Sequence, residues 1–324
     1  MFGKTARSAL IAALATLPCA GALAQGDYPA KPIRLIVPYP AGGGSDIMAR
    51  NVAEKLSEQL GRQVIVDNRG GASTVIGTEL ATKAPADGYT LLQATVTTLA
   101  VVPNVRAKLP YDFARDFTPI SMLATQPYVL VAHPSLPVTT MQQLIAHAKA
   151  NPGKLNFGSP SVGSGGHIAG ELLKEMTGIN ITHIGYKGTG PAVTDVVGGQ
   201  IPLVFATIPA VQNFIATGRL KALAVTTAKR SAALPGVPTV AESGVPGYET
   251  NSWTCLLAPK GTPAGIIKRL NAEVNKALQS PALEKRLVQL GFAPDPSTPQ
   301  ELAKYVNDQR ARYAKLLKSM DLRE

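Results

Sequence analysis

The chain has 324 residues, of which 45% are hydrophobic and 16% are charged. This length and balance predict one large or two ordinary globular domains, and the spread of glycine and proline along the chain excludes collagen-like and low-complexity sequences. Lys and Arg number 32 and Asp and Glu 21, a net charge of +11. That charge favours anionic partners without choosing among nucleic acids, lipid surfaces and small carboxylates.

The N-terminus predicts export. Two basic residues precede an apolar run over residues 8–17, which is too short to span a bilayer, and Ala22-Leu23-Ala24 is typical of a cleavage site. We therefore expect residues 1–24 to be a cleavable signal peptide and the protein to reside in the periplasm. A lipoprotein anchored at Cys19 is the alternative, which Pro18 directly before that cysteine disfavours.

Only Cys255 follows the predicted signal, so neither an intramolecular disulfide nor a cysteine-rich metal site is expected in the processed chain. No later segment has about eighteen uninterrupted apolar residues, so no transmembrane helix is expected after the signal. The processed protein is predicted to be soluble.

Predicted strands and helices alternate in the first part of the processed chain. A strand over residues 33–37 leads into a glycine-rich loop, the first glycine loop (residues 38–45), and apolar residues then recur at helical spacing. Further strands are predicted at 64–66 and 89–94, with a small-residue loop over 70–77 between them. This alternation predicts an α/β fold with a parallel sheet.

The same order recurs in the middle of the chain. A strand at 155–158 precedes the second glycine loop (residues 159–166) and a helix that Gly178 ends. A third copy joins a strand at 181–184 to the third glycine loop (residues 186–191) and a short helix. Roughly the last 65 residues are predicted to be helical and amphipathic.

A glycine loop that opens a helix suits an anion, because the first helical turn has unpaired backbone N–H groups and the positive end of the helix dipole. Few cations accompany these loops: Arg50 follows the first, His167 adjoins the second and Lys187 lies in the third. This scarcity favours a small carboxylate over a polyphosphate. One such loop is often only a turn, but three favour a binding site.

Other chemistries lack their motifs. Neither of the first two loops has the dinucleotide spacing G-x-G-x-x-G, the only G-K-T lies in the predicted signal, and no serine has the G-x-S-x-G setting of a hydrolase. The histidines lack metal-ligand spacing, so no metal and no cofactor are expected. His167 alone, beside the glycines, is a candidate to donate to a ligand as a neutral imidazole. The dispersed basic residues do not indicate nucleic-acid binding.

Many short motifs stand in order from Tyr28 to the C-terminal helices. They are Y-P at 28–29, K-P-I at 31–33, V-P-Y-P-A-G-G-G-S-D at 37–46, D-N-R at 67–69, A-D-G-Y-T-L at 86–91, D-F-T-P-I at 116–120, G-H-I-A-G-E-L at 166–172, Y-K-G at 186–188 and P-T-V-A-E at 238–242. Together they resemble the Bug-type receptors, the substrate-binding proteins of tripartite tricarboxylate transporters. The resemblance covers essentially the whole predicted mature chain.

The resemblance implies a type II periplasmic binding protein fold, an α/β fold in which two lobes are joined by two crossover strands and enclose a ligand cleft. Lobe 1 would comprise residues 25–124 plus 252–324, and lobe 2 residues 125–251. A glycine loop would then lie on each side of the cleft, and closure of the hinge would be the recognition step.

The resemblance also implies which residues hold the ligand. In the family the first loop binds a carboxylate through backbone N–H groups and ordered water, and Asp46 is expected to brace that loop rather than touch an anion. The other two loops would complete the site. The candidate ligand-binding residues are Tyr39, Ala41, Gly42, Gly43, Gly44, Asp46, Ala72, Ser73, Thr74, Thr95, Thr97, Ser161, Gly163, Ser164, Gly165, His167, Tyr186, Lys187, Gly188, Thr189 and Ala206.

This sequence departs from the family pattern at positions that bear on ligand specificity. Gly71-Ala72-Ser73-Thr74 stands where the family often has G-A-G-G, Ala206 where an acidic residue is common, and Cys255 where glycine is expected. Neutral drift is one explanation. The other is a more apolar distal pocket, which would suit a larger or aromatic acid.

The implied function is that of an exported solute receptor, not an enzyme. It would clamp a small carboxylate, either a dicarboxylate or an aromatic acid, for delivery to the membrane subunits of a tripartite tricarboxylate transporter. Two alternatives stay open: a periplasmic sensor that signals to a membrane kinase, and an exported enzyme with His167 as general base.

Overall fold

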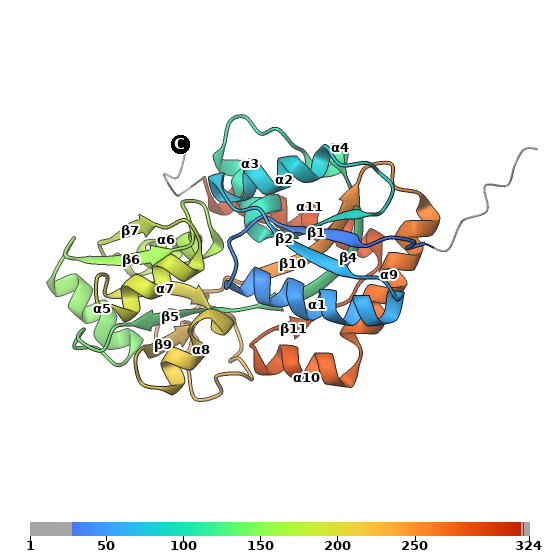
Figure 1. Cartoon of the computed structure of the whole chain (residues 1–324). Coiled ribbons are helices and arrows are strands. Elements are labelled where there is room, and N and C mark those ends of the chain that lie inside the picture. Colours follow the sequence, from blue (N-terminus) through green and yellow to red (C-terminus); the bar gives the residue numbers. More distant parts are fainter. Residues whose placement is uncertain (1–27, 319, 321–324) are drawn as a thin grey trace, which may run out of the picture.

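The computed structural model describes residues 28–318 and residue 320, so the predicted signal peptide lies outside the described residues. The described chain forms two α/β units, each built on its own β-sheet (Figure 1). The first and last thirds of the chain build one unit, and the middle third builds the other.

The first sheet has the strand order β11-β4-β10-β3-β1-β2. Strand β1 pairs in parallel with β2 and β3, whereas β10 runs antiparallel to β3 and β4. The predicted parallel sheet is therefore wrong for part of this sheet, because β4 and β10 run to and from the other unit. The strands are β1 (Ile33–Val37), β2 (Val64–Asn68), β3 (Thr90–Thr95), β4 (Phe117–Gln126), β10 (Ser252–Pro259) and β11 (Ala293–Pro294).

The second sheet has the strand order β7-β6-β8-β5-β9. Strand β6 pairs in parallel with β7 and β8, and β5 runs antiparallel to β8 and β9. This sheet is mixed for the same reason as the first. The strands are β5 (Tyr128–Ala132), β6 (Leu155–Ser159), β7 (Ile181–Gly185), β8 (Leu203–Thr207) and β9 (Lys221–Val225).

Two passages of the chain join the sheets. Strand β4 ends at Gln126 and β5 begins at Tyr128, while the return path leaves β9 and enters β10 at Ser252. Thr226 ties the passages together: its N–H donates to Tyr128 O at 3.0 Å, and its own carbonyl accepts from Thr250 N–H at 2.9 Å. A paired crossing of this kind is where a hinge between the units would bend.

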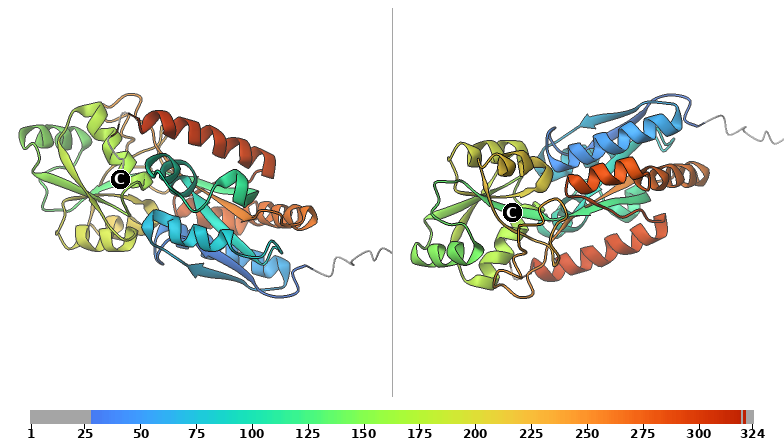
Figure 2. Two further views of the ribbon diagram at one scale, coloured as in Figure 1. Left: turned by 90° about the horizontal axis from the view of Figure 1, so that it is seen from above. Right: turned by 90° about the horizontal axis from the view of Figure 1, so that it is seen from below.

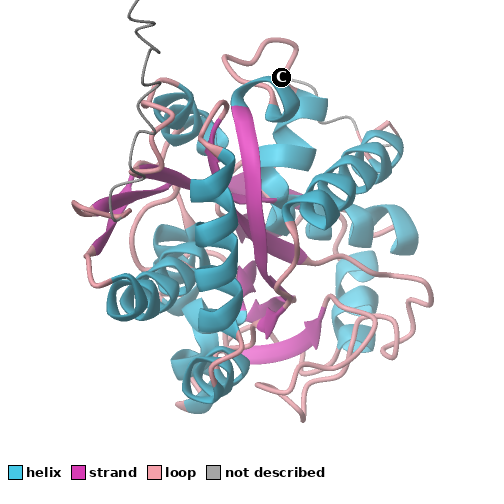
Figure 3. Cartoon of the chain, turned by 90° about the vertical axis from the view of Figure 1, so that its right-hand side faces the viewer, coloured by secondary structure: helices cyan, strands magenta, loops and turns pink. Residues whose placement is uncertain are grey.

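Helices cover both faces of the first sheet (Figures 2 and 3). Successive β1 residues point to opposite faces, so Ile33 and Leu35 pack with α1 and α9, whereas Ile36 belongs to the cluster that includes Leu302 of α11. The helical elements of this unit are α1 (Gly44–Leu60), the 3₁₀ turn η1 (Ala72–Thr74), α2 (Val75–Thr82), the π-helical turn η2 (Thr97–Val101), α3 (Val102–Val105), α4 (Phe113–Asp116), α9 (Ala264–Leu278), α10 (Pro281–Gln289) and α11 (Pro299–Leu316).

A glycine ends each of the helices that follow the first and second glycine loops, as the sequence predicts. Gly61 follows α1 with φ 65°, and Gly178 follows α6 with φ 68°, the left-handed conformation that glycine adopts without strain. The predicted loop over 70–77 is too long, because α2 already begins at Val75. The helices of the second unit are α5 (Met141–Ala150), α6 (Gly165–Thr177), α7 (Thr189–Val197) and α8 (Ile208–Ala216).

Among the described residues, no helix is both long and apolar enough to cross a membrane. Cys255 is a free, buried cysteine in β10. No group of three or more His, Cys, Asp or Glu side chains in the described part of the chain is arranged to hold a metal ion.

Candidate ligand-binding cleft

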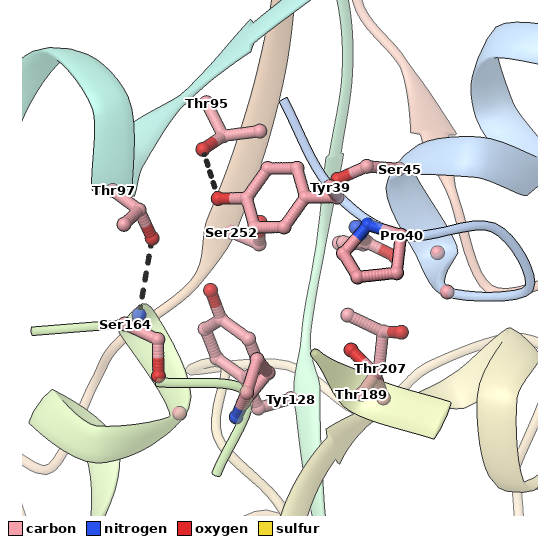
Figure 4. A pocket seen from close by; sticks show the side chains of 16 residues that line it. Tyr39, Pro40, Ser45, Thr95, Thr97, Tyr128, Ser164, Thr189, Thr207 and Ser252 are labelled. Atoms are coloured by element: carbon pink, nitrogen blue, oxygen red, sulfur yellow. Dashed lines mark hydrogen bonds between the residues drawn. The ribbon is translucent and has the colours of Figure 1, made fainter. Parts of the chain in front are cut away.

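A small cavity of about 40 Å³, the inner chamber, lies between the two sheets (Figure 4). A water needs roughly 10–15 Å³ of such volume, so the chamber has room for about three waters, which is the scale of one carboxylate group. Both units line it. Its residues are Tyr39, Pro40, Gly43, Gly44, Ser45, Thr95, Thr97, Gln126, Tyr128, Pro160, Ser164, Gly165, Gly166, Thr189, Thr207 and Ser252.

Four helices begin at the inner chamber. The residues concerned are Gly44 of α1, Gly165 of α6 and Thr189 of α7, together with Thr207 directly before α8. Each helix directs the positive end of its dipole and the unpaired N–H groups of its first turn toward its start. The chamber is therefore a place where negative charge is stabilised.

Three of these four helices lack a side-chain cap. Gly43, Gly188 and Thr207 precede α1, α7 and α8, and none of them makes a side-chain capping hydrogen bond. At α6, by contrast, Ser164 Oγ accepts from His167 N–H at 3.3 Å. Helix starts without a cap leave backbone donors available to a ligand or to water.

Two buried polar atoms of the chamber also have no hydrogen-bond partner among the described residues. They are Thr207 Oγ1 and Gln126 Oε1, in side chains that are 9% and 3% exposed. Buried polar atoms are nearly always paired, by protein, water or ligand. Thr207 adds a hydroxyl donor to the backbone donors, and Gln126 adds an acceptor.

Hydrogen bonds shape the chamber on its upper side in Figure 4. Tyr39 Oη and Thr95 Oγ1 lie 2.8 Å apart, and both belong to the first unit. Gly165 N–H donates to Thr97 Oγ1 at 3.3 Å, which links the second glycine loop to the first unit. Burial raises the pKa of Tyr128, so its hydroxyl stays neutral in the chamber.

Glycine is required at two positions because the other chain segments come close. A Cβ on Gly44 would lie 2.6 Å from Thr207 Oγ1, and one on Gly165 would lie 2.0 Å from Tyr128 Oη. Real Cβ atoms do not approach other atoms so closely. At Gly43 the nearest atom to such a Cβ would be Thr189 Oγ1 at 3.4 Å, so this position is less constrained.

A larger cavity of about 630 Å³, the outer chamber, adjoins the inner one and shares Tyr39, Pro40 and Pro160 with it. Lys187 lies exposed in its lining and makes no ion pair with the described residues. The outer chamber is lined by Pro38, Tyr39, Pro40, Gly70, Gly71, Ala72, Ser73, Thr74, Pro160, Ser161, Val162, Gly185, Tyr186, Lys187 and Gly188.

One wall of the outer chamber has an unusual backbone. Ala72, Ser73 and Thr74 have φ of 47°, 53° and 82°, the left-handed region that non-glycine residues rarely adopt. This conformation places Ser73 Oγ to donate to Val162 O at 2.9 Å, across the cleft. The hydroxyl links the two units at the outer chamber.

Most of the residues that the sequence nominates lie at one of the chambers. Those at the inner chamber are Tyr39, Gly43, Gly44, Thr95, Thr97, Ser164, Gly165 and Thr189. Those at the outer chamber are Ala72, Ser73, Thr74, Ser161, Tyr186, Lys187 and Gly188. Six others line neither chamber: Ala41, Gly42, Asp46, Gly163, His167 and Ala206.

Asp46 braces the first glycine loop. Its Oδ2 accepts from Gly42 N–H at 2.9 Å and from Arg50 Nε at 3.0 Å. Burial alone would raise the pKa of this carboxyl, but the hydrogen bonds from Arg50 and Gly42 outweigh it and lower the pKa below its usual value. Asp46 is therefore ionised, and its charge is already paired with Arg50 on α1.

The interpretation of Ala206 and Cys255 as signs of an apolar pocket needs correction. Both side chains are fully buried, Ala206 in the core of the second unit and Cys255 in that of the first. Neither residue lines the inner or the outer chamber. His167 likewise lines neither chamber, and its Nδ1 accepts from Gly163 N–H at 3.0 Å.

Sequence reasoning missed several lining residues of the inner chamber. Gln126, Tyr128 and Ser252 sit where the chain crosses between the units. Their strands carry no local motif, because only the crossing of two distant passages brings them to the chamber. The other missed residues are Pro40, Ser45, Pro160, Gly166 and Thr207. Pro40 and Ser45 lie in the first glycine loop and Pro160 and Gly166 in the second, so the loop signal could have found these four.

Comparison with known proteins agrees with this geometry. A family model described as the tripartite tricarboxylate transporter family receptor matches residues 48–322. Protein BugT of Bordetella pertussis is 41% identical over 302 residues, which are 93% of this chain and 93% of that protein. Both findings confirm the resemblance that the sequence motifs carry.

Solved structures give the same answer. An R. palustris protein solved with adipate is 40% identical with a TM-score of 0.88, covering 90% of this chain and 98% of that one. MatC from Rhodopseudomonas palustris, with bound malate, is 28% identical with a TM-score of 0.84, covering 90% and 100%. The predicted two-lobed fold of periplasmic binding proteins is thereby confirmed. The chain belongs to the tripartite tricarboxylate transporter receptor family, whose members are solute-binding receptors and not enzymes.

Proposed function

We propose that this chain is an exported receptor that clamps a small carboxylate between its two units and delivers it to the membrane subunits of a tripartite tricarboxylate transporter. The observation that carries the proposal is the convergence of α1, α6, α7 and α8 on the inner chamber, three of them without a side-chain cap. Residues 1–24 would direct the chain to the periplasm, where the ligand would be captured.

The two lobes that move relative to each other would correspond to the two sheets. Lobe 1 would comprise residues 25–124 plus 252–324, lobe 2 residues 125–251, and the hinge would lie where β4 passes into β5 and the return path enters β10. Gln126, Tyr128 and Ser252 lie at these passages and line the inner chamber. Closure would therefore assemble the chamber and enclose the ligand in one movement.

Each chamber would hold a different part of the ligand. One carboxylate group would occupy the inner chamber, and the rest of the molecule would extend into the outer chamber toward Lys187. Charge-assisted hydrogen bonds contribute about 1.5–3 kcal/mol each, so three or four of them suffice for the roughly 8 kcal/mol of a micromolar complex. A dicarboxylate fits better than an aromatic acid, because Lys187 offers a cationic partner for a second carboxylate group and related structures contain adipate and malate.

Calorimetric titration of the chain from Gln25 onward with malate, adipate, benzoate and phosphate tests this proposal. We expect micromolar binding of a dicarboxylate and no binding of phosphate. Thr207→Val removes the unpaired hydroxyl and should weaken binding about tenfold. Binding of phosphate without any carboxylate would refute the proposed function.

The position of the second carboxylate is tested by Lys187→Met. This change should weaken dicarboxylate binding about threefold and leave benzoate binding unchanged, since an exposed charge contributes little. Lys285→Met, at an exposed position on α10, is the matched control. An equal loss for both ligand classes would show that Lys187 does not meet the distal end of the ligand.

A further inference from the structure

A stacked pair of histidines lies behind the second glycine loop. The rings of His167 on α6 and His183 on β7 are 3.6 Å apart between centroids and inclined by 19°. His167 lines neither chamber, but it is four residues from Gly163 and within two of Gly165. The ring is therefore placed to act on the loop rather than on a ligand.

The hydrogen bonds define the tautomer of His167. Gly163 N–H donates to Nδ1 at 3.0 Å, so Nδ1 carries no proton. A neutral imidazole then has its proton on Nε2, which faces Glu171 Oε1 at 3.7 Å. The bond from Gly163 exists only while His167 is neutral, because an imidazolium carries protons on both nitrogens and cannot accept.

Gly163 is the bend of the second glycine loop. Its φ is 68°, which glycine adopts freely. Ser161, on one side of it, lines the outer chamber, and Ser164 and Gly165, on the other side, line the inner chamber. Holding the Gly163 N–H therefore holds both chamber walls in place.

Hydroxyl groups fix the rest of the loop. Ser164 Oγ donates to Ser159 Oγ at 3.0 Å, and Ser159 Oγ donates to Ser161 O at 3.0 Å. Since the proton of Ser159 is used in this way, His183 Nε2, at 2.7 Å, must donate to Ser159 Oγ. The His167 ring is the one titratable group with a hydrogen bond to the described backbone of this loop.

The charges around His167 come from two elements. Helix α6 contributes Glu171 and Lys174, which pair at 2.7 Å, and β7 contributes His183. Strand β6 contributes the Phe157 ring beside His167, and its Ser159 hydroxyl contacts His183. Burial is the main cause, and the Coulombic interaction with His167 the second, that lowers the pKa of His183 to about 3. His183 therefore stays neutral near physiological pH. Burial alone would raise the pKa of Glu171, but the interactions with His167 and Lys174 outweigh burial and lower this pKa below its usual value, so Glu171 is ionised.

We propose that His167 is a positioning residue that holds the second glycine loop through Gly163 N–H, and that protonation of His167 releases this bond and weakens ligand binding at acidic pH. The consequence for the ligand rests on the proposed function. Binding would be tightest while the His167 ring is neutral and would weaken once the ring takes up a proton, because Nδ1 can then no longer accept from Gly163 N–H. A receptor of this kind would give up its ligand more readily where protons are abundant.

Two substitutions separate the hydrogen bond from the proton. His167→Asn places an amide oxygen close to the position of Nδ1, so it can accept from Gly163 N–H and does not titrate. His167→Leu fills the site without an acceptor. Calorimetry with adipate at about pH 8 and about pH 5.5 would compare both variants with the unaltered chain.

We expect the affinity of the unaltered chain to fall about fivefold more than that of His167→Asn between these pH values, since one hydrogen bond is lost. Protonation of adipate itself affects both proteins equally and cancels in this ratio. His167→Leu should bind weakly at both pH values. Equal pH dependence in the unaltered chain and His167→Asn would overturn the proposal.

A measurement without ligand distinguishes failure of this inference from failure of the proposed function. In the ligand-free protein, NMR would follow the His167 ring nitrogens and the exchange protection of the Gly163 amide over the same pH range. We expect the amide to lose protection as the ring is protonated, and to keep it in His167→Asn. Protection that does not follow the state of the ring would refute the role of His167, whether or not adipate binds.

Discussion

The first and second glycine loops lie on opposite sides of the inner chamber, and different chemistry braces each of them. In the first loop the carboxylate of Asp46 accepts from Gly42 N–H and is paired with Arg50. In the second loop the neutral ring of His167 accepts from Gly163 N–H. In both, a side chain four residues further along accepts from a glycine N–H, but one brace is ionic and the other uncharged. The two loops are therefore held by side chains of different charge.

The largest effect is expected where the two units meet at a glycine. Gly44→Ala would place a Cβ 2.6 Å from Thr207 Oγ1, which belongs to the other unit. Closure should then be blocked, with affinity for adipate reduced by about 100-fold. The melting temperature of the ligand-free protein should stay near that of the unaltered chain, because the opposing residue would move away in the proposed open form.

The corresponding glycine of the second loop, Gly165, should respond differently to substitution by alanine. Gly165→Ala would place a Cβ 2.0 Å from Tyr128 Oη, and Tyr128 lies in the same sheet unit as α6. Here both affinity and melting temperature should fall. Gly190→Ala, with no atom within 4 Å of the added Cβ, is the control for both variants. If Gly44→Ala were as destabilising as Gly165→Ala, the assignment of Gly44 to the moving interface would be wrong.

The brace of the first loop should affect stability at acidic pH. Asp46→Ala is expected to lower the free energy of unfolding by roughly 2 kcal/mol at pH 7, because charge-assisted hydrogen bonds are lost. The pKa of Asp46 is lowered in the folded protein, so its stabilisation is present above the usual carboxyl pKa of 3.8 and is lost as the pH falls through the folded value. Denaturant unfolding at pH 7 and about pH 3 should show the difference between the two proteins shrinking in acid.

The matched control lies on the same helix. Glu54 forms an exposed ion pair with Arg286, with 63% of its side chain accessible, so Glu54→Ala should change stability by less than about 0.5 kcal/mol. A deficit of Asp46→Ala that is the same at both pH values would mean that its charge does not contribute.

The smallest effect is expected at the link across the outer chamber. Ser73→Ala and Ser73→Gly both remove the hydrogen bond to Val162 O and should weaken binding by about threefold, mainly through faster dissociation. They differ in backbone strain. At φ 53°, glycine should raise the free energy of unfolding by about 1 kcal/mol relative to alanine. Stopped-flow dissociation and denaturant unfolding measure the two effects separately.

Much of the local structure follows from the order of residues alone. The strand at Ile33–Val37, the helix after the first glycine loop and the ends at Gly61 and Gly178 were all predictable, because backbone freedom and hydrophobic spacing act over a few residues. Glycine loops before helices also indicated an anion site. The same local signals missed the direction of β10 and the early start of α2.

The sequence by itself thus determined the family, the alternation of strands and helices, and the loops that open helices toward an anion. Tertiary structure alone decided which of these loops meet, because strands distant in sequence pair antiparallel and carry the chain across the cleft. That crossing brings Gln126, Tyr128 and Ser252 to the inner chamber. Packing also determined the positions of two side chains that the sequence nominated as ligand contacts. Ala206 lies in a hydrophobic core. His167 accepts a hydrogen bond from the Gly163 backbone, because a buried polar atom needs a partner and this N–H is close to it.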